Sequence, residues 1–93
     1  MMIGLLEIDL FSEQFHSLKD KRRLVSSLKG RLQNKFNIAV AESDYQELWQ
    51  KAQLSIVSLG QNRASLESRF QQIEEFIYLN YALEISRMQV RFY

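Results

Sequence analysis

Hydrophobic and polar residues alternate along the chain with two different periods. In several short segments, apolar side chains recur at every second position, which is the pattern of a strand with one buried face. In two longer segments they recur every three to four positions, as on the buried side of an amphipathic helix. The predicted strands span residues 2–11, 37–43, 52–59 and 82–93, and the predicted helices span residues 18–36 and 63–80.

The order of these elements is strand, helix, strand, strand, helix, strand. It leaves few topologies, because crossover connections are right-handed and consecutive elements lie close together. We therefore expect an α+β protein with the ferredoxin-like βαββαβ sandwich. The four strands would form an antiparallel sheet in the order 4-1-3-2, with two helices on one face and the other face open. No linker or repeat interrupts the chain, so residues 1–93 are predicted to form a single domain.

Composition narrows the classes of protein to which the chain could belong. It contains no cysteine, which excludes a disulfide framework and a thiolate zinc site. The apolar run at the N-terminus is interrupted by Glu7 and Asp9, and no run of about 20 apolar residues exists. We therefore expect no signal peptide, no membrane span, and a cytoplasmic protein with no membrane partner.

Charge is distributed unevenly along the sequence. The net charge is only +1, but residues 17–36 contain seven basic side chains and one acidic side chain. The rest of the chain contains five basic and ten acidic side chains. This concentration favours a local contact with an anionic partner, such as RNA or a ribosome, over a uniformly basic surface.

The start of the first predicted helix is the first candidate site. At 100° per residue, four of its cations share one arc of roughly 120°. These candidates for binding an anion or RNA are Lys19, Arg22, Arg23 and Lys29. Cations at a helix N-terminus are disfavoured by roughly a few tenths of a kcal/mol each, and a bound phosphate would offset that cost.

Other interpretations of this basic segment stay open. The cations could form a solvated face and pair with acids of the same chain, such as Asp20, Glu42 or Asp44. A third reading is a regulatory domain that holds a phosphate-bearing small ligand at the helix start. Lys21 lies nearer the apolar side, so we expect its stem to be buried and its ammonium group to meet a carboxylate.

The open face of the predicted sheet is the second candidate surface. Its positions mix apolar and charged side chains, and the interface candidates among them are Ile3, Leu5, Glu7, Asp9, Val57 and Arg87. Such a face favours a homodimer, with a partner protein or plain exposure as alternatives. RNA binding on this face is disfavoured, because the aromatic motif that RNA-recognition modules place on their central strands is missing.

The sequence offers little for catalysis. His16 is the only histidine, no cluster has the spacing of metal ligands, and no nucleophile or phosphate-loop motif occurs. We expect no enzymatic activity, no metal and no cofactor. Trp49 has two readings: a partner contact, or a loop anchor that covers one end of the core, which is favoured.

Three pieces of sequence combine into a family likeness. They are "SLKDKRR" at residues 17–23, "NIAVAE" at residues 37–42 with Asp44, and Trp49 with Gln50. Together they make the chain resemble the YlxP-like family of small bacterial proteins over nearly its whole length. Glu47 departs from the family pattern, which has aspartate there.

The resemblance implies a ferredoxin-like α+β fold and no known activity. Genes of the family often lie beside those for translation and ribosome-maturation factors, which points toward RNA or the ribosome. The resemblance therefore agrees with the fold expected from periodicity and implies no catalytic residue.

Overall fold

The computed structural model describes all 93 residues and has the predicted ferredoxin-like architecture. The elements are β1 (Met2–Phe11), α1 (Leu18–Lys35), β2 (Ala39–Asp44), β3 (Lys51–Gly60), α2 (Arg63–Asn80) and β4 (Glu84–Phe92). The strands form one antiparallel sheet in the order β2-β3-β1-β4, which is the predicted arrangement named from the opposite edge. The predicted ends of the elements differ from the observed ones by no more than two residues.

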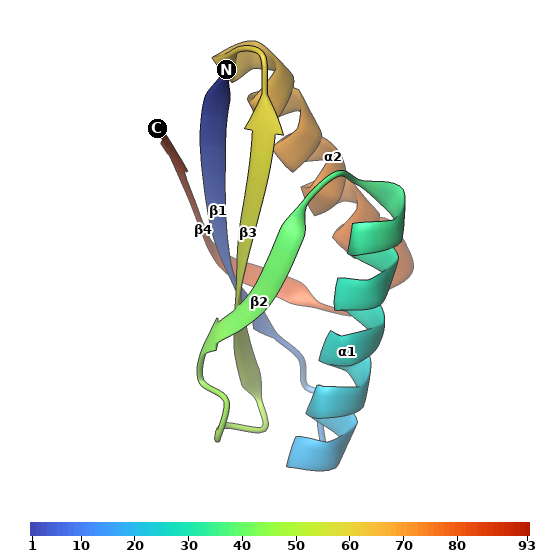
Figure 1. Ribbon diagram of the computed structural model, residues 1–93. Helices are drawn as coiled ribbons and strands as arrows, with labels where there is room; N and C mark the ends of the chain where they lie inside the picture. Colours follow the sequence, from blue (N-terminus) through green and yellow to red (C-terminus); the bar gives the residue numbers. More distant parts are fainter.

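Both helices pack on the same side of a strongly twisted sheet, as Figure 1 shows, and the core lies between the two layers. The central strands β1 and β3 supply paired apolar side chains, for example Leu6 opposite Ile56 and Ile8 opposite Leu54. These four side chains are at most 1% exposed. The helices contribute the buried residues Val25, Leu28, Leu32, Phe70, Ile73 and Ile77. The apolar stripes seen in the sequence are therefore the core.

Local sequence explains where the helices begin. Ser17 precedes α1 in an extended conformation, and its hydroxyl oxygen accepts a hydrogen bond from the Asp20 amide at 3.1 Å. Asn62 does the same for α2, accepting from the Ser65 amide at 2.9 Å. Each cap satisfies one of the N–H groups that a helix start leaves unpaired.

A glycine in β1 sets how closely α2 approaches the sheet. A Cβ atom at Gly4 would lie 2.8 Å from the ring of Phe70, closer than real contacts allow. Glycine at this position therefore lets the Phe70 ring lie directly against the strand. Neither helix is long and apolar enough to cross a membrane.

Candidate functional site

The cations of residues 17–36 fall into two groups: those whose charged groups contact other parts of the chain and those whose charged groups do not. Lys21 belongs to the first group. Its side chain is fully buried, and Nζ donates to the carbonyl oxygens of Tyr45 at 2.7 Å and Lys51 at 3.0 Å. A carboxylate oxygen of Glu42 lies 3.0 Å from Nζ, in a geometry that gives an ion pair without an aligned hydrogen bond. The prediction of a buried stem and a carboxylate partner is confirmed.

The two carbonyl groups that Lys21 contacts lie at the two ends of the turn between β2 and β3. Tyr45 has φ 62°, in the left-handed region that bulky side chains rarely adopt. The ammonium group of Lys51 lies 4.3 Å from the centre of the Tyr45 ring. Lys21 therefore ties the first turns of α1 to the β2–β3 hairpin and favours a strained backbone there.

Arg31 and Lys35 also belong to the group of cations that contact other parts of the chain. The Arg31 guanidinium lies 5.0 Å from the ring centre of Phe76 and 5.3 Å from that of Tyr81. It also donates to the Tyr81 hydroxyl at 3.1 Å, and Lys35 lies 5.3 Å from the Phe76 ring centre. These contacts hold the second half of α1 against α2 and its C-terminal end, so both cations have an internal role.

The second group consists of the four cations that the sequence pattern singled out, and we call their surface the basic face: Lys19, Arg22, Arg23 and Lys29. None of them forms a hydrogen bond or an ion pair with the rest of the chain. The first three are exposed, and Lys29 is half-buried. None of the three expected partners pairs with this face: Glu42 pairs with Lys21, Asp44 accepts from the Tyr45 amide, and Asp20 forms no ion pair.

The basic face lies on the side of α1 that is turned away from α2. Arg31 and Lys35 mark the side of α1 that faces α2, and at 100° per residue the basic face lies on the opposite side. At the helix start, Ser17 already caps the Asp20 amide. The cap uses one N–H group of the first turn, so an anion at this end would meet the remaining N–H groups together with the side chains of the basic face.

The six interface candidates lie on the open sheet face but separate into two regions. Leu5 stands opposite Val57, and Ile3 stands opposite Leu59. Ile3, Val57 and Leu59 are 42%, 39% and 49% exposed. These residues form what we call the apolar end. Sequence reasoning omitted Leu59, although it follows Val57 by two positions and the alternation could have identified it.

The other end of the open face is polar and is paired within the chain. Asp9 is only 3% exposed, accepts a hydrogen bond from Gln53 at 2.9 Å, and lies 3.9 Å from charged nitrogens of both Lys51 and Arg87. Glu7 stands between the two ends, opposite Ser55. Asp9 and Arg87 are therefore paired within the chain, which leaves Ile3, Leu5 and Val57 as the candidates for self-association.

Trp49 lies in the turn between β2 and β3 and is 43% exposed. It lines a shallow hollow of about 260 Å³ with Phe11, Leu48, Gln50 and Lys51, and it is not part of the buried core. The favoured reading of Trp49 as an anchor over the core is therefore wrong, since the turn leaves the indole open to solvent.

Comparison with known proteins gives a family but no activity. The family model described as "Protein of unknown function (DUF503)" matches residues 3–90. The chain is also similar to the "Uncharacterized protein YlxP" of Bacillus subtilis (strain 168), with 34% identity over 76 residues, covering 82% of this chain and 83% of the relative. Because the family model spans nearly the whole chain, this protein belongs to the DUF503, YlxP-like family of proteins of unknown function.

Proposed function

We propose that the chain is a small, non-enzymatic binding protein that contacts the phosphates of RNA, free or in a ribosome, through the basic face of α1. One observation carries the proposal. Of the seven cations in residues 17–36, three have partners within the chain, and the four on one side of α1 have none. Unpaired cations on one rigid helix match a ligand with regularly spaced negative charges.

The expected mechanism is electrostatic contact without reading of the base sequence. No aromatic side chain belongs to the basic face, and the aromatic residues near α1 are covered by Arg31 and Lys35. If all four cations contact phosphates, the logarithm of the affinity falls against the logarithm of the salt concentration with a slope of about −3 to −4. The proposal places this contact in the cytoplasm, where RNA and ribosomes are found.

Co-sedimentation with ribosomal subunits and with total RNA, at low and at moderate salt, tests the proposal. Arg22→Glu with Arg23→Glu is expected to weaken binding by roughly tenfold or more. The matched control, Arg63→Glu with Arg91→Glu, changes the net charge equally at distant positions and should bind almost normally. Equal binding by the two double variants would contradict a specific role of the basic face.

The apolar end of the open sheet supports a second candidate function, a homodimer. Ile3, Leu5, Val57 and Leu59 are adjacent across the central strands, and an exposed apolar cluster on a sheet is typical of a protein interface. Sedimentation velocity at tens of micromolar tests this function. A dimer that Val57→Asp converts to a monomer would support it, and a wild-type monomer would exclude it.

A further inference from the structure

The outer edge of β4 is unpaired, and its free backbone groups belong to known residues. β4 is the last strand of the sheet and has only β1 as a neighbour. Ile3 and Tyr93 exchange two backbone hydrogen bonds, of 2.9 and 2.8 Å. Since bonded pairs alternate along an antiparallel ladder, the backbone groups of Met88, Val90 and Phe92 point to the outside of the sheet.

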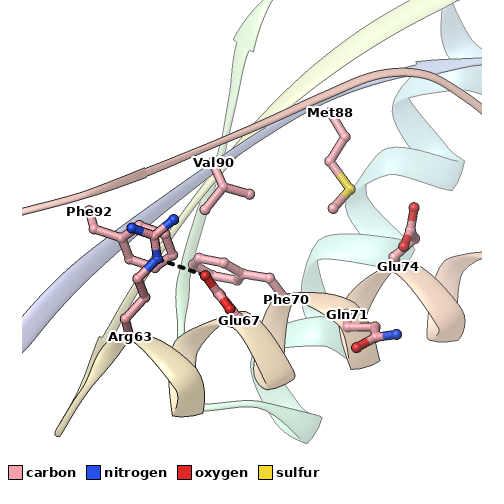
Figure 2. A pocket seen from close by; sticks show the side chains of 8 residues that line it. All are labelled: Arg63, Glu67, Phe70, Gln71, Glu74, Met88, Val90 and Phe92. Atoms are coloured by element: carbon pink, nitrogen blue, oxygen red, sulfur yellow. Dashed lines mark hydrogen bonds and ion pairs between the residues drawn. The ribbon is translucent and has the colours of Figure 1, made fainter.

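The side chains of the same three residues line a groove between β4 and α2. Figure 2 shows the groove, with Val90 and Phe70 at its centre, Met88 beside Glu74 at one end, and Phe92 under Arg63 at the other. Its volume is about 350 Å³. The groove is open because α2 packs over β1 and β3, which leaves Met88 38% exposed.

On the opposite face, the same strand carries two arginines. Arg87, Gln89 and Arg91 alternate with the groove residues. Arg87 donates a hydrogen bond to Gln89 and forms an ion pair with Asp9, whereas Arg91 has no partner in the chain. The edge therefore combines free backbone groups, an apolar groove on one face and, on the other face, two arginines, of which only Arg91 lacks a partner within the chain.

We propose that the outer edge of β4 binds an extended segment of a partner protein, which adds to the sheet as a fifth strand and alternates apolar with acidic side chains. Directly opposite residues of paired strands share a face. Side chains opposite Met88 and Val90 would therefore enter the groove, and side chains opposite Arg87 and Arg91 would meet positive charge. Backbone hydrogen bonds would supply affinity, and the alternation would supply selectivity.

A second copy of β4 is a poor occupant of the same edge. Antiparallel pairing of two β4 strands would gather two copies each of Arg87 and Arg91 on one face, and every register that sets arginine directly opposite arginine is destabilised by like charge. An acidic, alternating segment removes this repulsion. The edge is separate from the basic face of α1, so the proposal does not depend on RNA binding.

Binding of a labelled synthetic peptide, Glu-Val-Thr-Val-Glu-Val between polar flanks, tests this inference by fluorescence anisotropy. Its control, Lys-Val-Thr-Val-Lys-Val with the same flanks, is expected to bind at least about tenfold more weakly. Arg91→Glu should weaken binding of the acidic peptide by about fivefold and strengthen binding of the basic one. Equal binding of the two peptides, or no binding of either, would overturn the proposal.

Two further measurements locate the peptide on the edge. Amide exchange at Met88, Val90 and Phe92 should slow when the acidic peptide is bound. Met88→Pro removes an outward N–H without touching the ladder to β1 and should abolish binding, whereas Met88→Ala keeps the N–H and should bind. Unchanged exchange, or normal binding by a folded Met88→Pro variant, would contradict strand addition. Self-association of the chain that Met88→Pro abolishes would instead identify a second copy.

Discussion

The two sides of α1 carry the same kinds of side chain and use them differently. On the inner side, Lys21 is fully buried with two carbonyl oxygens and a carboxylate, and Arg31 lies over aromatic rings. On the outer side, the four cations of the basic face have no partner in the chain. The comparison shows that a run of basic residues is not one feature: its inner members make contacts that hold α1 to the hairpin and to α2, and its outer members form no hydrogen bond or ion pair within the chain.

The comparison predicts that Lys21→Met has the largest effect on stability. Methionine keeps the stem but removes the charge, which leaves the Tyr45 and Lys51 carbonyl groups and the half-buried Glu42 without their partner. Breaking a buried ion pair is expected to lower the free energy of unfolding by about 3 kcal/mol. Urea denaturation followed by circular dichroism measures this loss. A loss below about 1 kcal/mol would show that the inner side is not structural.

Arg31→Ala should have a smaller effect of the same kind. It removes an exposed guanidinium that lies over two rings and donates to the Tyr81 hydroxyl, so we expect a loss of about 1 kcal/mol. Arg31→Lys retains the charge and is expected to lose less. RNA binding should not change in either variant. A clear loss of binding without a loss of stability would show that Arg31 contacts RNA, as is proposed for the basic face.

Gly30→Ala gives the smallest expected effect, in the opposite direction. A Cβ atom at Gly30 would meet no other atom within 4 Å, so alanine fits the helix without strain. Because glycine is a poor helix former, the substitution should stabilise the protein by up to about 1 kcal/mol. Thermal unfolding measures the gain. A destabilised variant would contradict this and would show that another group packs closely against Gly30.

Much of this architecture could be predicted from the sequence because periodicity is a local property. The alternation in residues 2–11 and the helical stripe through Val25 and Leu28 indicate which faces are buried before any contact is known. The same helical geometry placed Lys21 on the inner side. Helical periodicity cannot identify the carbonyl groups of Tyr45 and Lys51 as the partners of Lys21, because the positions of these groups depend on the conformation of the β2–β3 hairpin.

The parts that sequence reasoning missed depend on contacts between distant segments. Arg31 meets Phe76 and Tyr81, which lie on another helix and just beyond it. The groove beside β4 exists because α2 packs over β1 and β3. A local sequence pattern does not indicate over which strands of the sheet a helix will lie. The burial of Asp9 likewise needs Gln53, Lys51 and Arg87 from two neighbouring strands.

The most direct test of the account measures RNA affinity against salt, together with thermal stability, for one glutamine variant of each outer cation and for Lys21→Met. The account predicts that each outer variant reduces the steepness of the salt dependence by about one and leaves the melting temperature almost unchanged. Lys21→Met should lower the melting temperature and, where folded, keep the wild-type steepness. Salt-independent binding, or equal slopes in all variants, would contradict the claim that the outer side of α1 is a phosphate-binding surface.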